Sequence, residues 1–195
     1  PLTEGLPSIL EANLAIAPSN PQVVYAMAAT TNPAGGSGPV GLYKSTDGGA
    51  HWTVRTRSAG RPEEPGTLDR RPLGRIGGGD LPTIVVDPLD ENVVYSASIV
   101  MWRTEDGGAS WSAVRGSPGG DDYQRIWVHP TDPNVLLVVS DQGAVVSANR
   151  GASWSNWYNQ STAAVYHTTT DNAYPYRVCS GQQDSGSLCV ASRSD

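Results

Sequence analysis

The stretch KSTDGGAHW, residues 44–52, returns twice further along the chain, as RTEDGGASW at 103–111 and SANRGASW at 147–154. Each copy has Ser or Thr, then Asp or Asn two residues later, Gly after two more, and Trp seven residues after the Ser or Thr. Oxygens at this spacing can accept hydrogen bonds from nearby backbone N–H groups. The Gly can adopt positive φ, and the Trp can bury a large area between sheets. We therefore expect one structural turn made three times, by Ser45, Asp47, Gly49 and Trp52, by Thr104, Asp106, Gly108 and Trp111, and by Ser147, Asn149, Gly151 and Trp154.

An apolar run precedes each copy, passes through a Pro-bearing turn and continues as a second apolar run. The three are LAIAPSNPQVVYAM (14–27), IVVDPLDENVVYSA (84–97) and IWVHPTDPNVLLVV (126–139). Their Val, Ile and Tyr content is typical of strands, so each unit reads strand A, turn, strand B, strand C, repeated turn, strand D. Pro88 and Pro130 are 42 residues apart, which is the period of a four-stranded propeller blade.

These spacings predict an all-β fold: β-propeller blades, about three complete four-stranded blades plus the start of a fourth, forming part of a larger ring. Such a set cannot close a ring, and open sheet edges favour self-association or packing against the remainder of a longer chain. The chain divides into blade 1 (1–57), an inter-blade insertion (58–80), blade 2 (81–118), blade 3 (119–160) and the start of blade 4 (161–195).

Composition limits the classes of partner. Of 195 residues, 22 are glycine, 15 are proline and 16% are charged, a mix typical of turn-rich β proteins. The net charge of −6 argues against nucleic acid, which favours a basic face, and the lack of an apolar run of 18 residues argues against membrane insertion. His51, His129 and His167 do not form a ligand cluster with the cysteines, so we expect no metal and no cofactor. The start at Pro1 looks like that of a processed or truncated product.

The two cysteines leave two interpretations open. Cys179 and Cys189 lie in CSGQQDSGSLC, and a loop of this length can close as a disulfide across a hairpin, which fits an exported protein. Two reduced thiols packed as small apolar side chains fit the same spacing.

The repeated turn resembles the Asp-box, or BNR repeat, of pattern S/T-x-D-x-G-x-x-W. The first two copies match it fully, and the third has Asn149 in place of Asp. Asp-box propellers include sialidases, the xyloglucan-cleaving enzymes of glycoside hydrolase family 74, the sortilin (Vps10) domain and a photosystem II assembly factor. The stretches GGGDLPTIVVDP, GGDDYQRIWVHP and YHTTTDNAYPYRVCSGQQDSGS look most like large bacterial secreted proteins of the sortilin and family 74 type. The resemblance implies a secreted or periplasmic, glycosyl hydrolase-like protein.

Strand direction places the candidate site. Strands alternate in direction, so A–B and C–D turns share one face of a propeller and B–C and D–A loops share the other. The repeated turns are C–D turns, and their carboxylates are engaged by the turn itself, so we expect ligands on the opposite face. Polar residues on that face are Asp80 in GRIGGGD, Asp121, Asp122, Tyr123 and Arg125 in RGSPGGDDYQR, Asp141 in SDQG, and Gln182, Gln183 and Asp184 in GQQDSG.

Two functions fit these residues. One is binding of a carbohydrate or peptide ligand through Asp80, Asp122, Tyr123, Gln182 and Gln183. The other is glycoside hydrolysis of a β-glucan such as xyloglucan, which needs two carboxylates. VLLVVSDQGAV resembles the family 74 stretch that carries one catalytic Asp, which implies Asp141, with Asp184 or Asp121 as the second carboxylate. The residues after it depart from the family pattern, and Asp141 can equally cap a tight turn, so whether the chain is an enzyme stays open.

Overall fold

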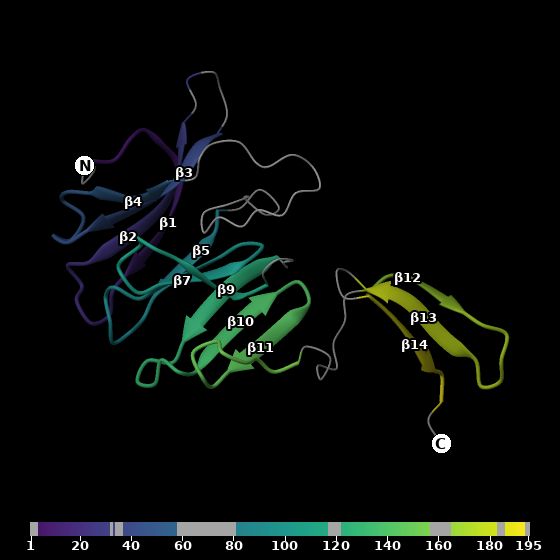
Figure 1. Cartoon of the computed structure of the whole chain (residues 1–195). Helices are drawn as coiled ribbons and strands as arrows, with labels where there is room; N and C mark the ends of the chain where they lie inside the picture. Colours follow the sequence, from purple (N-terminus) through teal and green to yellow (C-terminus); the bar gives the residue numbers. More distant parts are fainter. Residues whose placement is uncertain are drawn as a thin grey trace.

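The chain is built from antiparallel β-sheets. A computed structural model describes residues 4–31, 33, 37–57, 81–116, 122–156, 165–182 and 186–193. Within these ranges fourteen strands form four sheets, and no described residue lies in an α-helix (Figure 1). The described residues therefore contain no helix long and apolar enough to cross a membrane. The predicted all-β class is confirmed.

Two sheets have four strands and two have three, and in each the strands pair in chain order. Sheet 1 contains β1 (Ile9–Ile16), β2 (Val24–Thr31), β3 (Ser37–Ser45) and β4 (Thr53–Arg57). Sheet 2 contains β5 (Thr83–Val86), β6 (Val94–Ala97), β7 (Met101–Thr104) and β8 (Ser112–Arg115). Sheet 3 contains β9 (Tyr123–Val128), β10 (Leu136–Ser140) and β11 (Gly143–Ser147). Sheet 4 contains β12 (Val165–Thr170), β13 (Arg177–Gln182) and β14 (Gly186–Ala191).

The main core lies between consecutive sheets. One apolar cluster joins sheets 1 and 2 and contains the fully buried Tyr25, with Trp111 packed against it. The next cluster joins sheets 2 and 3 and contains the fully buried Tyr95, with Trp154 packed against it. Trp111 and Trp154 thus each pack between their own sheet and the preceding one, as the repeat predicted. Trp52 has no preceding sheet among the described residues and packs in a third cluster with Leu6 on the outer face of sheet 1.

The repeated turns close through their own side chains. In the second turn the hydroxyl of Thr104 accepts a hydrogen bond from the backbone N–H of Gly108 at 2.9 Å. A carboxylate oxygen of Asp106 accepts from the backbone N–H groups of Ala109 and Ser110, both at 2.8 Å. The first and third turns repeat the pattern through Ser45 and Asp47 and through Ser147 and Asn149. The amide oxygen of Asn149 therefore replaces the carboxylate at the third turn.

Each repeated turn also binds the A–B turn of its own sheet. The N–H of Gly48 donates to the carbonyl of Gln22 at 2.8 Å, and the N–H of Gly107 donates to that of Asn92 at 2.9 Å. In the third turn the N–H of Arg150 donates to the carbonyl of Asn134 at 2.9 Å. Arg150 has a φ of 59° and is the one described non-glycine residue with positive φ. A–B and C–D turns therefore share one face, which we call the turn face.

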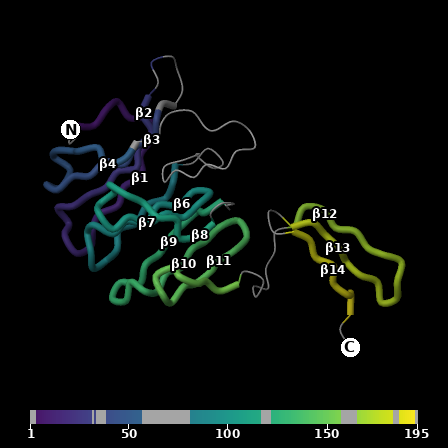
Figure 2. Tube along the Cα trace, viewed as in Figure 1, coloured from purple at the N-terminus to yellow at the C-terminus, as the bar shows by residue number. Residues whose placement is uncertain are grey.

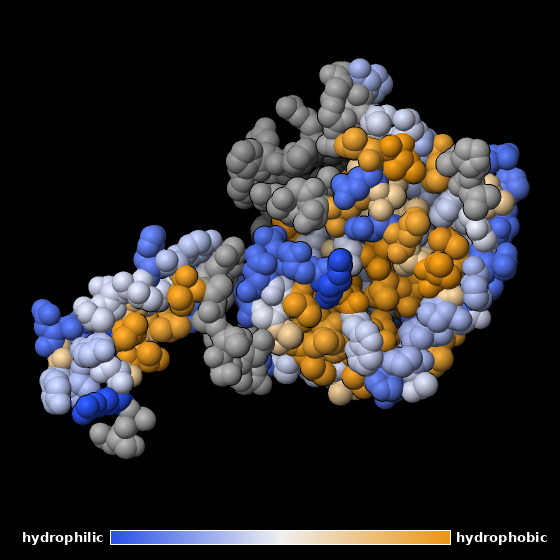
Figure 3. All heavy atoms as spheres, turned by 180° about the vertical axis from the view of Figure 1, so that it is seen from behind, coloured by the Kyte–Doolittle hydropathy of each residue, from blue (hydrophilic) through white to orange (hydrophobic). Residues whose placement is uncertain are grey.

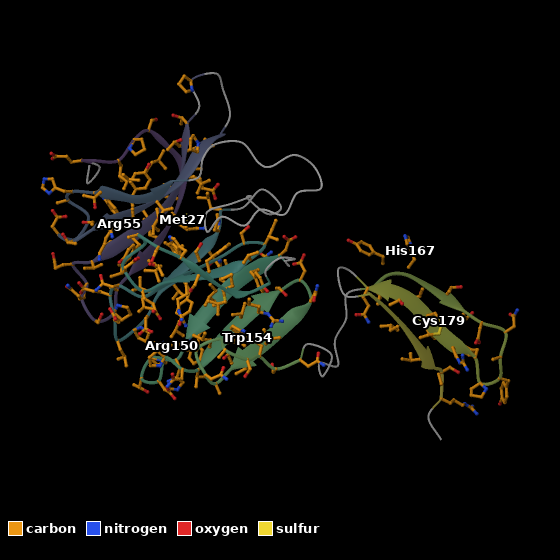
Figure 4. All side chains as sticks on the ribbon, viewed as in Figure 1. Met27, Arg55, Arg150, Trp154, His167 and Cys179 are labelled. Atoms are coloured by element: carbon orange, nitrogen blue, oxygen red, sulfur yellow. A yellow bond between two sulfur atoms is a disulfide. The ribbon has the colours of Figure 1, made fainter. Side chains whose placement is uncertain are left out.

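The turn face also holds neighbouring sheets together. Arg55 of β4 donates from Nε to the carbonyl of Gly107 at 2.9 Å, next to the second turn. Arg150 in the third turn reaches the fully buried Asp87 of sheet 2 at 2.8 Å. Figure 4 labels Arg55 and Arg150, the side chains that join the turns of successive sheets. The turns therefore lock the order of the sheets as well as closing each one.

Sheets 3 and 4 differ from the first two. Sheet 3 has three described strands, and Ser155 lies beside β11, its N–H donating to the carbonyl of Val146 at 2.8 Å. The fourth strand predicted for this unit stays a prediction, since 157–164 lie outside the described residues. Sheet 4 lies apart from the other three in the Cα trace (Figure 2). Its paired residues Cys179 and Cys189 form a disulfide, the first of the two interpretations left open above.

Candidate functional site

A polar cleft opens along the first strands of three consecutive sheets. Its volume is about 350 Å³. It is lined by Glu11 and Asn13 of β1, Leu81 and Thr83 at β5, Ser98 after β6, and Asp122, Tyr123, Gln124 and Arg125 at β9. Ser98 belongs to the β6–β7 turn, and consecutive turns of an antiparallel sheet lie at opposite ends. The cleft therefore opens on the face opposite the turn face, and we call it the channel cleft.

Backbone and amide hydrogen bonds fix the walls of the channel cleft. The side-chain amide of Asn13 donates to the carbonyls of Leu81 and Pro82, at 3.3 and 3.2 Å, which ties sheet 1 to the start of β5. The N–H of Tyr123 donates to the carbonyl of Ser98 at 2.9 Å, which ties the start of β9 to sheet 2. The cleft is therefore held by rigid strands rather than by loops alone, as a pre-formed binding site requires.

Two predicted ligand-binding residues lie in this cleft. Asp122 and Tyr123 come directly before and at the start of β9, and both line it. Tyr123 is buried, so its ring forms a wall rather than a projecting platform. Asp141 lies on the adjacent β10–β11 turn with an exposed side chain, and its N–H donates to the carbonyl of Asp122 at 3.3 Å. The structure thus brings Asp141 to the rim of the cleft.

The other predicted residues lie elsewhere or outside the described residues. Gln182 ends β13 on sheet 4, and Figure 4 shows that sheet, with its labelled His167 and Cys179, away from the labelled residues of the first three sheets. Asp80, Asp121, Gln183 and Asp184 fall outside the described residues. The second carboxylate proposed from the sequence, Asp121 or Asp184, therefore stays a prediction.

Arg125, a further predicted residue of this face, also lines the cleft. The sequence analysis missed five other polar residues of the cleft: Glu11, Asn13, Thr83, Ser98 and Gln124. All of these except Ser98 lie within first strands, whereas the predicted residues came from segments expected to be loops. The sequence does mark such positions, because these polar side chains interrupt segments that are otherwise apolar and are predicted to be strands. In a propeller the first strand of each blade borders the central channel, so polar positions on it face solvent there.

The carboxylates of the turn face differ from those of the cleft. The pKa of Asp47 is held well below its ordinary range by hydrogen bonds from the backbone and side chain of His51 and from Ser45. The pKa of Asp106 is lowered in the same way by the side chain and backbone of Ser110 and by Thr104. A carboxylate stabilised in its charged form by its own turn is a poor proton acceptor. The carboxylates of Asp47 and Asp106 are therefore engaged by their own turns.

Comparison with known sequences points to one group of enzymes. No family model matches the chain. The chain is 25% identical over 197 residues to a xyloglucanase of Paenibacillus sp., in an alignment that covers 91% of this chain and 18% of that enzyme. The chain thus spans less than a fifth of the length of this curated relative.

Comparison with solved structures finds similar folds in enzymes of glycoside hydrolase family 74. The fold resembles a glycoside hydrolase family 74 enzyme of Niastella koreensis, with TM-score 0.53 and 13% identity, over 92% of this chain and 28% of that one. It also resembles the family 74 xyloglucanase of Xanthomonas campestris, with TM-score 0.52 and 18% identity, over 90% of this chain and 27% of that one. The chain is therefore a propeller segment similar to those of glycoside hydrolase family 74, which confirms the predicted fold class.

Proposed function

We propose that this chain is a carbohydrate-binding propeller segment of a secreted, glycoside hydrolase-like protein, and that the channel cleft holds a neutral oligosaccharide. The observation that carries the proposal is the cleft itself, which is polar, open and built on the first strands of three sheets. Similarity to a xyloglucanase supports carbohydrate as the ligand class over peptide. The disulfide between Cys179 and Cys189 supports export, because such bonds persist in oxidising compartments.

The lining chemistry suits sugar hydroxyls, which both donate and accept hydrogen bonds. Carboxylates of Glu11 and Asp122 accept from hydroxyl groups, while the Arg125 guanidinium and the Gln124 amide donate to hydroxyl oxygens. Glu11 lies on β1, whereas Asp122, Gln124 and Arg125 lie on β9 or directly before it, so a ligand that contacts Glu11 and any of the other three bridges sheets 1 and 3. Hydrogen bonds to the charged side chains of Glu11, Asp122 and Arg125 are the stronger ones and set the largest expected effects.

Titration calorimetry with a xyloglucan oligosaccharide, a linear cello-oligosaccharide and a peptide of similar length tests this proposal. We expect saturable binding of at least one glycan and none of the peptide. Glu11→Gln and Arg125→Ala should each weaken binding by about tenfold, because each removes one charged contact. Glu105→Gln is the matched control, an exposed glutamate on the turn face whose loss should leave affinity unchanged. Equal affinity of the Glu11 variant and the control would place the ligand elsewhere.

Hydrolysis is the second candidate function, and two observations favour it. The chain resembles a xyloglucanase, and carboxylates of Glu11 and Asp122 line the cleft that has Asp141 at its rim. In glycoside hydrolysis one carboxylic acid protonates the leaving oxygen, while a second carboxylate either activates water or attacks the anomeric carbon. Asp141 is the proposed first carboxylate, with Asp121 or Asp184 as the second.

Turnover of a xyloglucan oligosaccharide, followed by release of reducing ends, separates this candidate from binding alone. Asp141→Asn should lower kcat by at least a hundredfold while leaving affinity within about threefold, because the amide keeps the shape but cannot exchange the proton. Gln142→Glu on the same turn is the control and should retain turnover. Full turnover by the Asp141 variant would remove Asp141 from the mechanism, and no turnover by the natural chain would leave binding as its function.

A further inference from the structure

Exposed tyrosines among the described residues are confined to sheet 4. The four described tyrosines of sheets 1 to 3 are at most 6% exposed, whereas Tyr166, Tyr174 and Tyr176 are 67%, 90% and 48% exposed. Tyr174 and Tyr176 lie in the connection between β12 and β13, on either side of Pro175. Figure 3 shows sheet 4 beside the three-sheet body, and this connection lies at the far end of the sheet. Two exposed rings in one short connection form a contact surface rather than part of the core.

The β12–β13 connection has the same frame as the A–B turns of the other sheets. Each A–B turn is closed by a hydrogen bond from the N–H of its first residue to the carbonyl of its seventh. Donor and acceptor are Ala17 and Val23 in sheet 1, Asp87 and Val93 in sheet 2, His129 and Val135 in sheet 3, and Asp171 and Arg177 in sheet 4. Tyr174 is therefore the fourth residue of its turn, and Tyr176 is the sixth.

The fourth and sixth positions face solvent even where the turn is packed. The sixth residue is exposed in each of sheets 1 to 3, and the fourth is exposed in sheets 2 and 3 and half-buried in sheet 1. These turns nevertheless bind the repeated turns of their own sheets. The residues are Asn20, Asp90 and Asp132 at the fourth position, and Gln22, Asn92 and Asn134 at the sixth. The exposure of Tyr174 and Tyr176 therefore follows from their positions in the turn.

The fourth turn also closes without the side chain at its fourth position. In sheets 1 to 3 a side-chain oxygen of the fourth residue accepts from the N–H of the sixth, as Asp90 does at 2.9 Å. In sheet 4 the carboxylate of Asp171 accepts instead from the N–H groups of Ala173 at 3.1 Å and Arg177 at 2.9 Å. The turn is thus held from its first residue, so the fourth position can carry an aromatic ring.

The tip of the turn is uncharged and amphipathic. Between Asp171 and Arg177 the chain reads NAYPY, which contains no charged side chain, and the Asp171 carboxylate is engaged by the turn. A sugar ring suits such a surface, because its C–H groups pack on the negative face of an aromatic ring. Its hydroxyl groups can bond the tyrosine hydroxyls and the amide of Asn172. A charged ligand would find no counter-charge at this tip.

We propose that Tyr174 and Tyr176 form a surface platform that binds a neutral polysaccharide chain outside the channel cleft. The ligand class rests on the proposed function and on the similarity to a xyloglucanase. A projecting turn contacts its ligand from one side only, so it suits an extended polymer rather than an enclosed oligosaccharide. The platform shares no residue with the channel cleft, so a short oligosaccharide can fill the cleft without blocking the platform.

Native electrophoresis of the full chain through gels that contain xyloglucan polymer tests the proposal. Retardation is measured in a background of Glu11→Gln and Arg125→Ala, which weakens the cleft and leaves the platform as the main site. Tyr174→Ala should raise the polymer concentration at half retardation by about fivefold. Tyr174→Leu should do the same, because it keeps an apolar side chain without an aromatic face, whereas Tyr174→Trp should retain binding.

Tyr166→Ala is the matched control, because Tyr166 is 67% exposed on the same sheet but lies at the end away from the turn. Equal retardation of the Tyr174→Ala and Tyr166→Ala variants would overturn the platform. Capture of the chain by an immobilised proline-rich peptide, lost in Tyr174→Ala and without retardation by xyloglucan, would assign the turn to a protein partner and overturn the proposal equally.

Calorimetry with a short xyloglucan oligosaccharide reports on the cleft separately. Tyr174→Ala in the otherwise natural chain should leave this affinity unchanged. Oligosaccharide binding without any dependence of polymer retardation on Tyr174 would contradict the platform and leave the cleft proposal standing. Retardation that depends on Tyr174, without oligosaccharide binding, would support the platform and contradict the cleft proposal alone.

Discussion

The two faces of this propeller segment use the same types of residue in opposite ways. On the turn face, the carboxylate of Asp106 accepts hydrogen bonds from its own turn, and that of Asp87 is buried against Arg150. In the channel cleft, Glu11 and Asp122 line an open space of about 350 Å³. A carboxylate that already has protein partners contributes stability, whereas one that faces a cleft can exchange water for a ligand. The carboxylates of a repeated motif are therefore weak guides to a functional site.

This contrast predicts that changes on the turn face alter stability and leave ligand affinity unaltered, and that changes in the cleft do the reverse. Four substitutions on the turn face test this prediction, and they are given in order of decreasing expected effect. Each is measured by denaturant unfolding or thermal unfolding beside its control, and each variant that folds is then titrated with the glycan bound by the natural chain.

The largest effect is expected at the third turn. Gly151 has φ of +88°, and a Cβ there would lie 2.2 Å from Cγ1 of Val114 in sheet 2. Gly151→Ala should therefore destabilise the chain by about 3–4 kcal/mol, through backbone strain and overlap between sheets. Gly181→Ala is the control, because a Cβ there meets nothing within 4 Å, and it should cost under about 1 kcal/mol. Similar values for the two glycines would show that sheets 2 and 3 are not packed so closely.

The next effect concerns the ion pair that joins sheets 2 and 3. Asp87 is fully buried and accepts from Arg150 at 2.8 Å and from the N–H of Leu89 at 2.9 Å. Asp87→Ala leaves the cation partly buried without its partner and should cost about 2–3 kcal/mol, less than a fully buried pair because the Arg150 side chain is 35% exposed. The exposed Asp90, which caps its own turn, is the control, and Asp90→Ala should cost about 1 kcal/mol or less. Equal costs would mean that the ion pair does not hold the two sheets together.

A single hydroxyl gives the third effect. Thr104 accepts from the N–H of Gly108 at 2.9 Å and donates to Asp106 at 2.8 Å, and it is buried. Thr104→Val keeps the shape, loses these two bonds and the one accepted from the N–H of Asp106 at 3.3 Å, and should cost about 1–2 kcal/mol. Thr46→Val, at an exposed position of the first turn, should change stability by less than about 0.5 kcal/mol. Altered glycan affinity in the Thr104 variant would break the contrast between the two faces.

The smallest effect depends on pH. His51 contacts Asp47 at 2.6 Å and Glu4 at 3.4 Å, and these carboxylates raise the pKa of His51. The stabilisation is therefore complete below the ordinary His pKa of about 6.5 and is lost as pH rises through the raised value. His51→Ser copies the second turn, where Ser110 donates to Asp106. The natural chain should exceed this variant in thermal midpoint at pH 6 by more than at pH 9.

A difference between the two chains that does not change with pH would show that the His51 contacts contribute no proton-linked stability. The second turn supplies an internal reference, since Ser110 does not titrate in this range.

Much of the fold could be predicted because each repeat is defined by residues that lie close together in the sequence. The order of strands in sheets 1 and 2, the shared face of the A–B and C–D turns, and the packing of Trp111 and Trp154 between sheets all follow from residue spacing along a single unit. The candidate site was predictable only in its face. Asp122, Tyr123 and Arg125 were predicted because they lie in a segment expected to be a connection between blades, whereas Glu11 and Gln124 lie within strands and were not predicted.

Each repeating unit is encoded in its own stretch of sequence: a turn with Ser or Thr, Asp or Asn, Gly and Trp at set intervals closes through hydrogen bonds between residues at most a few positions apart. The surface that the units form together depends instead on how the sheets pack. The channel cleft joins residues from β1 to β9, more than a hundred positions apart, and no spacing along one unit encodes that distance. Sheet-to-sheet packing sets it, because each Trp and each glycine at a close approach fixes how near the next sheet can come.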